Sequence, residues 1–381
     1  MWLLWSACVG MGLLGAMILG RKTFSERDWL HPTQLVTKGI AGLVLVSFVF
    51  CFSCYGYPLV TLSFITIVSV FISFFATKSK GGIIGSARRW GSRLLYEYLG
   101  RFYPQPFWTC MNYGYADLSS SSSAPSEDAA FKEALAMLKL EHQTDEGETG
   151  GEYYGLRLYL HVAAATPFGG DLSDKEILEI GSGRGGGAAF VGRVLRPKHL
   201  LGVDFSSSAV EFCRRRHCQK QGEDEAGERR YNLEFQQGDA ENLVNVPSSS
   251  KDVVMNVESA HCYGSMSKFL SEVRRVLCKG GYFTMAGFVK TESANILREQ
   301  LKESGLKMLN EEDITPNVLR SLQLDEARKR KLIEETFAKQ GYLHSFFKGF
   351  AKGAYALEGT NMRVSFERGE TKYLSFVLQK V

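Results

Sequence analysis

The sequence predicts an α/β protein, with a doubly wound, mostly parallel sheet of seven strands preceded by N-terminal transmembrane helices. From residue 175 onward, short apolar runs alternate with runs of helical period, which is typical of parallel strands joined by helices. A glycine-rich stretch, "EIGSGRGGG" at 179–187, overlaps the end of the first apolar run. Two long uncharged runs, at 1–20 and 40–77, set the beginning of the chain apart.

The overall charge gives no indication of nucleic-acid binding. Lys plus Arg total 45 against 41 for Asp plus Glu, a net charge of +4. The eight cysteines are scattered and suggest no disulfide framework, so we expect the folded part to face a reducing compartment. Cys213, His217 and Cys218 lack a second ligand pair at zinc-site spacing, so we expect no bound metal.

Residues 1–80 are expected to form a membrane anchor. The second uncharged run is about twice the ~20 residues that one span needs, and "YGYP" at 55–58 divides it. Two spans here place the basic segments 21–38 and 78–93 on one side of the bilayer, as the positive-inside rule favours, whereas one long tilted span would separate them. We therefore expect three transmembrane helices in the endoplasmic reticulum or another endomembrane, with the catalytic domain facing the cytosol.

Residues 81–170 are expected to form a juxtamembrane and helical segment. The stretch 86–104 is basic and aromatic, and it fits either a helix lying on the membrane surface or a solvated helix. A serine-rich loop follows at 118–128, and helical patterns cover 129–141 and 153–162.

Residues 171–381 are expected to form the sheet domain. Its strands are expected at 176–180, 199–205, 232–240, 252–259, 280–288, 305–315 and 371–380, and its helices at 188–195, 206–213, 264–277 and 292–304.

The glycine turn between the first strand and the first helix fits two classes of ligand. Gly181-x-Gly183-x-x-Gly186 satisfies the dinucleotide fingerprint, with Asp204 where a ribose-binding acid belongs. In both classes the ligand lies against the N-terminus of the helix that follows the turn.

The alternative ligand is S-adenosylmethionine, whose pattern Glu179-x-Gly181-x-Gly183-x-Gly185 is spelled by the same stretch. The third strand separates the two classes. Its end, "GDAENL", places Asp239 where a carboxylate can accept a hydrogen bond from an adenine amino group. Nicotinamide-binding folds do not require an acid there, so the sequence favours S-adenosylmethionine.

Residues 175–288 resemble the class I S-adenosylmethionine-dependent methyltransferases, whose fold is Rossmann-like. More narrowly, "LEIGSGRGGGAAFVGRVLRPKHLLGVDFS", "GDAENL" and "VVMNVESAHCYGSMSKFLSEVRRVLCKGGYF" look like the phthiotriol/phenolphthiotriol dimycocerosate methyltransferases. The resemblance extends to "MNYGYAD" at 111–117, to 156–163 and to 358–380, but not to 1–85. It implies O-methylation of a lipid hydroxyl, and a last strand that runs antiparallel between the fifth and the sixth.

The resemblance also implies roles for residues of the turn and the strand ends. The turn passes under the methionine part of the cofactor, and Glu179 orients that part. Asp204 binds both ribose hydroxyls. Asp239 and Ala240 frame the adenine. The expected cofactor-binding set is Glu179, Gly181, Ser182, Gly183, Gly185, Gly186, Asp204, Phe205, Asp239, Ala240 and Val257.

A hydroxyl acceptor must lose a proton, so the site needs a base. In "VESAHCY", after the fourth strand, we expect His261 to be the base and Glu258 to orient it or to contact the cofactor. The alternative for His261 is a helix-capping or substrate-shaping role. Four tyrosines either line an apolar acceptor pocket or pack in the core, namely Tyr113, Tyr115, Tyr153 and Tyr154.

Three other functions stay open. Carbon methylation of a sterol or terpenoid alkene would use aromatic faces to steady a cation instead of a base. A membrane-tethered protein could bind S-adenosylmethionine without catalysis. An NAD(P)-dependent oxidoreductase would need a Tyr-x-x-x-Lys pair, but Tyr153 and Tyr263 have Arg157 and Ser267 at that spacing. The expected partners are a lipid or other hydrophobic acceptor and the membrane, with no nucleic acid.

Overall fold

The computed structural model describes residues 97, 109–118, 129–142, 152–218, 232–337, 348 and 351–381. The expected membrane anchor at 1–80 lies outside these residues, as do the expected surface segment apart from Glu97 and the serine-rich loop apart from Leu118. Within the described part of the chain, no helix combines the length and hydropathy of a membrane span.

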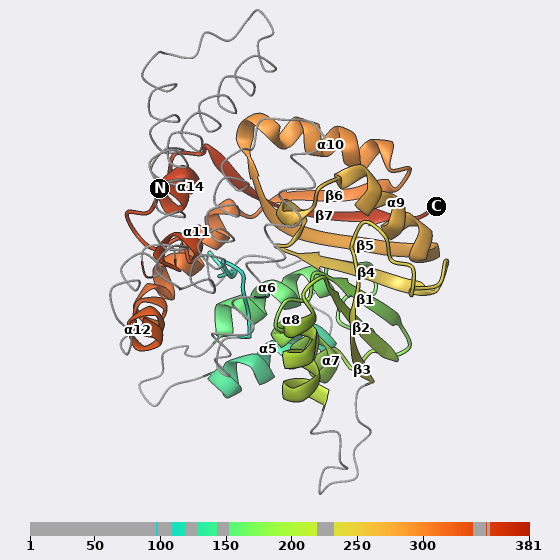
Figure 1. The fold of residues 1–381 in the computed structure, drawn as a ribbon, viewed down its shortest axis with the longest axis horizontal. Coiled ribbons are helices and arrows are strands. Elements are labelled where there is room, and N and C mark those ends of the chain that lie inside the picture. The colour runs from blue at the N-terminus through green and yellow to red at the C-terminus, as the bar shows by residue number, and fades with distance from the viewer. Residues whose placement is uncertain are drawn as a thin grey trace, which may run out of the picture. The chain divides into compact units, whose positions relative to one another are not determined.

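Seven strands form one mixed sheet in the order β3-β2-β1-β4-β5-β7-β6 (Figure 1). The strands are β1 Glu176–Ile180, β2 His199–Asp204, β3 Leu233–Gln237, β4 Lys251–Val257, β5 Leu277–Lys290, β6 Lys307–Asp313 and β7 Thr371–Gln379. β1 to β5 pair in parallel. β7 lies antiparallel between β5 and β6, which confirms the expected seven-stranded, mostly parallel arrangement.

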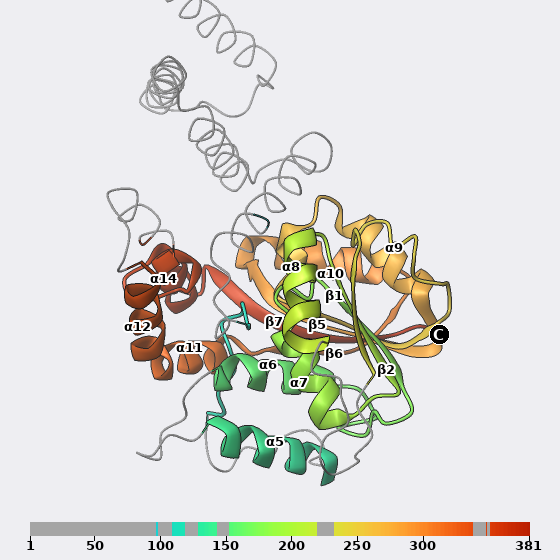
Figure 2. The same cartoon turned by 60° about the horizontal axis from the view of Figure 1, so that its bottom comes forward.

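Helices cover both faces of the sheet because side chains alternate between the faces along each strand. Ile177 belongs to the core under α5 to α8, whereas Leu178 belongs to the core under α9 and α10. Figure 2 shows α5 and α6 on one side of the sheet and α9 and α10 on the other. These helices are α5 Ala129–His142, α6 Tyr153–Ala163, α7 Gly186–Leu195, α8 Ser207–Cys213, α9 Met266–Val276 and α10 Ala294–Glu303.

Local capping explains where two of the helices begin. The Ser206 side chain accepts a hydrogen bond from the amide of Ala209 at 3.2 Å, and the Ser265 side chain accepts one from the amide of Lys268 at 3.3 Å. Each serine is the N-cap of its helix, α8 or α9. Caps of this kind satisfy amide groups that the first helical turn leaves unpaired.

Three helices that the sequence patterns did not predict lie between β6 and β7 within the described residues. They are α11 Thr315–Leu324, α12 Glu326–Phe337 and α14 Asn361–Glu367. They lie together at one end of the sheet in both views (Figures 1 and 2). Because β6 leads directly into α11 and α14 leads into β7, this is the end at which the parallel strands terminate, and the helices help to build the site.

Candidate active site

A cavity with about 890 Å³ of empty space, open to solvent, lies at the carboxyl ends of β1, β2 and β4. The strand order reverses at β1, and ligands of doubly wound sheets bind at such a switch point. The lining residues are Thr109, Met111, Asn112, Tyr159, Ile180, Gly181, Ser182, Gly183, Arg184, Val203, Asp204, Phe205, Ser206, Gly238, Asp239, Ala240, Val257, Glu258, Ser259, Cys262 and Tyr263. Nine of the expected site residues are among them: Gly181, Ser182, Gly183, Asp204, Phe205, Asp239, Ala240, Val257 and Glu258.

The glycines of the turn are required for different reasons. Gly181 and Gly183 have φ values of +80° and +54°, which side chains rarely adopt. A Cβ on Gly181 would lie 2.2 Å from the hydroxyl oxygen of Ser259, whereas one on Gly183 would meet nothing within 4 Å. Gly183 therefore leaves its backbone open to a ligand.

Gly185 and Gly186 are not among the lining residues. A Cβ on Gly185 would lie 2.7 Å from the Phe235 ring, and one on Gly186 would lie 2.2 Å from the hydroxyl oxygen of Thr109. The two glycines thus allow neighbouring chain segments to approach the start of α7. Their effect on a ligand is indirect.

Asp204 ties the glycine turn to the end of β2. Its Oδ2 accepts a hydrogen bond from the amide of Gly183 at 2.8 Å, and its Oδ1 accepts one from the amide of Ser206 at 2.9 Å. Burial raises the pKa of this carboxyl to about 6, although the amides oppose the shift. Each carboxylate oxygen can accept more than one hydrogen bond, so the pair of ribose hydroxyls expected here remains compatible with the two amides.

Three residues from two strand ends form another part of the cavity wall. Phe205 follows β2, and Asp239 and Ala240 follow β3. Asp239 accepts a hydrogen bond from the amide of Glu241 at 3.0 Å, which fixes its carboxylate at the turn. These three residues line the cavity where the sequence predicts the adenine site, and their role there stays a prediction.

Glu179 is fully buried, and it contacts Tyr159, which lines the cavity. The Tyr159 hydroxyl donates to Oε1 of Glu179 at 2.8 Å, and Tyr159 lines the cavity although Glu179 does not. The other oxygen, Oε2, has no hydrogen-bond partner among the described residues. Burial raises the pKa of the Glu179 carboxyl to about 7. An uncompensated buried acid of this kind favours a cationic group nearby.

Glu258 lines the cavity, but His261 does not. The Oε2 atom of Glu258 accepts hydrogen bonds from the Tyr113 amide at 2.9 Å and the Tyr373 hydroxyl at 2.7 Å. Burial raises the pKa of Glu258 to about 7. The His261 ring packs against Phe288 with 4.5 Å between ring centroids. The structure thus brings the two expected catalytic residues into one loop, and only Glu258 into the cavity wall.

Residues 109–113 supply a part of the site that the sequence patterns did not identify. Thr109, Met111 and Asn112 line the cavity. Glu152, at the start of α6, accepts hydrogen bonds from the amides of Thr109 at 2.7 Å and Cys110 at 2.6 Å. The family resemblance places "MNYGYAD", residues 111–117, beside the acceptor pocket, but it assigns no role to Thr109, Met111 or Asn112.

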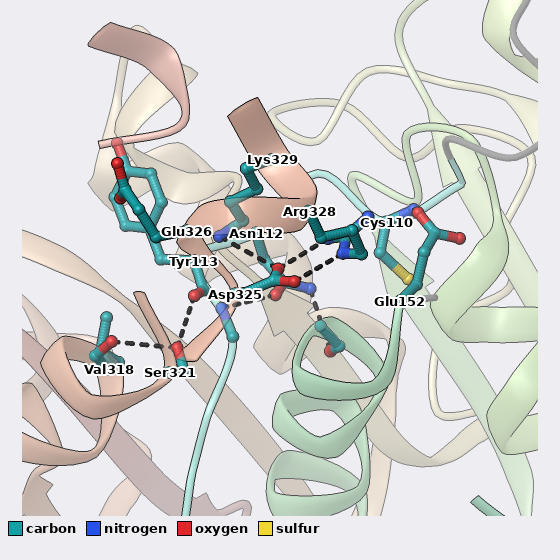
Figure 3. A network of polar contacts seen from close by, with 12 residues as sticks. Cys110, Asn112, Tyr113, Glu152, Val318, Ser321, Asp325, Glu326, Arg328 and Lys329 are labelled. Atoms are coloured by element: carbon teal, nitrogen blue, oxygen red, sulfur yellow. Dashed lines mark hydrogen bonds and ion pairs between the residues drawn. The ribbon is translucent and has the colours of Figure 1, made fainter. Parts of the chain in front are cut away.

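The α11–α12 region contacts residues 109–113 through Ser321 of α11 (Figure 3). The Ser321 hydroxyl donates to the Tyr113 carbonyl at 2.7 Å. Asp325 pairs with Arg328 at 2.5 Å and with the buried Lys329 at 3.6 Å. The bond between Ser321 and Tyr113 joins elements more than 200 residues apart in sequence.

The four tyrosines proposed as acceptor-pocket residues are buried but do not line the cavity. Tyr113 stacks on Phe288 with 5.7 Å between ring centroids, and Tyr115 stacks on His161 at 4.5 Å. Tyr153 and Tyr154 meet edge to face. All four tyrosines therefore pack in the core, which is the second of the two expected alternatives.

The chain is similar in sequence and in fold to known methyltransferases. The family model described as a methyltransferase domain matches residues 178–285. A phthiotriol/phenolphthiotriol dimycocerosates methyltransferase of Mycobacterium tuberculosis is 31% identical over 224 residues, which cover 59% of this chain and 76% of the relative. A fatty-acid O-methyltransferase of Mycolicibacterium smegmatis is 38% identical over 170 residues, which cover 45% of this chain and 56% of the relative.

Among solved structures, the [4+2]-cyclase SpnF superposes with a TM-score of 0.52 and 17% identity, covering 76% of this chain and 95% of that protein. A putative sarcosine dimethylglycine methyltransferase from Galdieria sulphuraria gives the same TM-score with 14% identity, covering 74% and 97%. These likenesses establish the fold alone.

The Asp204→Ala variant should bind S-adenosylmethionine about 10- to 100-fold more weakly than the wild type. It loses the expected ribose contacts, worth on the order of 1.5–3 kcal/mol for hydrogen bonds to a charged group, and it also frees the turn. Isothermal titration calorimetry measures the change. Asp174→Ala is the control, since this acid is exposed and pairs with the neighbouring Lys175. Unchanged affinity in Asp204→Ala would remove Asp204 from the site.

Binding of S-adenosylmethionine should release protons near pH 6, and its affinity should fall as pH falls from about 7 to 5. The raised pKa of Asp204 leaves the ligand-free carboxyl partly protonated near pH 6. A ligand that carries net positive charge and donates hydrogen bonds from its hydroxyls favours the carboxylate form of Asp204. Calorimetry in two buffers of different ionisation enthalpy gives the number of protons released. Asp204→Asn should release fewer, and equal release would contradict the assignment.

Proposed function

Because the chain belongs to the family of class I S-adenosylmethionine-dependent methyltransferases that includes the phthiotriol/phenolphthiotriol dimycocerosate methyltransferases, we propose that it transfers the methyl group of this cofactor to a hydroxyl of a lipid. Two related proteins named above point to lipids by their names, one of them a fatty-acid O-methyltransferase. The single observation that carries the choice of a hydroxyl is the Glu258 carboxylate in the cavity wall.

The residues of this chain perform three tasks in the proposed reaction. The cofactor supplies an already activated methyl group, so the protein mainly holds donor and acceptor in line and excludes water. The glycine turn, Asp204 and Asp239 are suited to hold the donor, and Thr109, Met111 and Asn112 close the wall beside Glu258. As the O–CH₃ bond forms and the S–CH₃ bond breaks, the acceptor hydroxyl gives its proton to Glu258.

Glu258 suits the role of base better than His261, which reverses the expected division of labour. Oε2 is occupied by two donors, and no hydrogen bond within the described residues engages Oε1. Burial places the pKa of Glu258 at about 7, and a base is most effective when its pKa is close to the working pH. His261 lies outside the lining and interacts with Glu258 electrostatically, so we propose that it supports the charged form.

A carboxylate acceptor, as in the fatty-acid relative, fits this cavity less well. Such an acceptor is already ionised and needs no base. It would also approach Glu258, while Asp204 and the buried Glu179 add two more acids nearby. Like charges at short range in a site of low polarity repel strongly. A neutral hydroxyl avoids this repulsion and uses the carboxylate.

We further propose that residues 1–80 anchor the enzyme in a membrane, with the catalytic domain on the cytosolic side. The support is the uncharged runs at 1–20 and 40–77 and the two basic segments that flank the second run. An anchored enzyme gains a high effective concentration of a membrane lipid.

Glu258→Gln should lower turnover by ~10²–10⁴-fold, the usual contribution of a positioned base, with little change in affinity for S-adenosylmethionine. The wild-type rate should rise as pH rises through about 7, because the carboxylate form of Glu258 accumulates there, and the variant should lack this limb. His261→Ala should lose less activity. The exposed Glu335→Gln serves as control. Full turnover in Glu258→Gln would favour carbon methylation or a carboxylate acceptor.

Incubation of membranes containing the full chain with labelled S-adenosylmethionine should label a lipid that mass spectrometry identifies as a methyl ether. Removal of residues 1–80 should leave cofactor binding intact, while methylation of the bilayer-embedded lipid falls sharply. Label in a methyl ester or on carbon would reject the hydroxyl acceptor. Equal rates on the embedded lipid for the truncated and full chains would reject a role of the anchor in delivery.

A further inference from the structure

Tyr373 contacts the proposed base although it lies outside the cavity. It belongs to β7, the antiparallel strand, and it is completely buried. Its hydroxyl donates to Oε2 of Glu258 at 2.7 Å across 115 residues of sequence. Tyr373 is not a lining residue, so it can act on a substrate only through Glu258.

The backbone of Glu258 needs this kind of external support. Its φ is +50°, in the left-handed region, where a residue with a side chain is strained. The Glu258 amide donates to the Ala286 carbonyl at 2.8 Å and holds the turn. In this turn, the Oε2 atom of the Glu258 carboxylate accepts hydrogen bonds from the Tyr113 amide and from the Tyr373 hydroxyl.

We propose that Tyr373 is a positioning residue, whose hydroxyl holds Oε2 of Glu258 so that Oε1 is presented to the acceptor hydroxyl as its proton acceptor. This inference rests on the proposed function. In the reaction, the S–CH₃ bond of the cofactor breaks as the O–CH₃ bond forms, and the proton of the broken acceptor O–H bond passes to Oε1. Tyr373 itself keeps its proton throughout, because burial and the neighbouring Glu258 raise the pKa of its hydroxyl well above the usual value.

The hydrogen bond from Tyr373 also favours the charged form of Glu258. Burial raises the pKa of Glu258, and the bonds from Tyr373 and from the Tyr113 amide lower it. The titratable or charged groups that face Glu258 are Tyr373 of β7, Tyr113 of the 109–118 segment, Tyr159 of α6, His261 of its own loop and Lys329 of α12. Among these side chains, and within the described residues, only that of Tyr373 donates a hydrogen bond to the carboxylate.

The Tyr373→Phe variant of the full-length enzyme tests the proposal. Loss of a hydrogen bond to the charged form should move the pH at which turnover is half-maximal upward by about one unit. Turnover at pH 7 should fall several-fold and recover at pH 9, while the dissociation constant for S-adenosylmethionine stays within about twofold. The matched control is Tyr282→Phe, whose hydroxyl bonds Gln379 elsewhere on the β5–β7 pair.

A measurement without substrate separates this inference from the proposed function. Carbon-13 NMR of protein labelled at the glutamate carboxyl carbon, with Glu258→Gln to assign the signal, follows the titration of Glu258 directly. An upward shift in Tyr373→Phe supports the proposal. An unchanged titration, or a loss of turnover equal at every pH, overturns it. A wild-type enzyme inactive on every hydroxyl lipid would overturn the proposed function, and the NMR titration would then judge Tyr373 alone.

Discussion

The cofactor end of the site depends on one carboxylate that accepts hydrogen bonds from the backbone amides of two different loops. Asp204 lies at the end of β2, yet it bonds the amide of Gly183 in the turn after β1 and the amide of Ser206 before α8. Without it, the turn would be held to β2 by the bonds of the Gly181 and Ser182 amides to the Val203 carbonyl, and two partly buried donors would lose their partner. The side chain expected to recognise the ligand therefore also shapes the backbone on which the ligand lies.

The two ends of the cavity are assembled differently. The cofactor end uses strand ends and short turns, whose positions follow from the pairing of β1 with β2 and β4. The end at which we propose that the acceptor binds is built from segments that precede or follow the parallel strands, namely residues 109–113, the α11–α12 region and Tyr373 of β7. Local sequence determines the first end, while contacts distant in sequence determine the second.

This difference explains what the sequence could predict. Periodicity placed β1 at its observed bounds and β2 within one residue, and the glycine spacing located the cavity. The sequence patterns did not predict α12, because its sequence "EARKRKLIEETF" is highly charged and shows few apolar residues that would mark a buried face. Its Lys329 is nevertheless buried beside Asp325. The sequence favoured His261 over Glu258, which we propose as the base, because the two donors to Glu258 come from residues 145 and 115 positions away in the sequence.

The insertion of β7 between β5 and β6 has a consequence for the order in which the protein is made. During synthesis β6 emerges from the ribosome before β7, which separates it from β5 and is its partner in the finished sheet. Until β7 arrives, β5 and β6 each expose a strand edge, and such edges recruit other chains. The nascent protein must therefore keep an incomplete sheet from aggregating, and the acidic residues of β6, Glu311, Glu312 and Asp313, provide the charge that discourages such pairing.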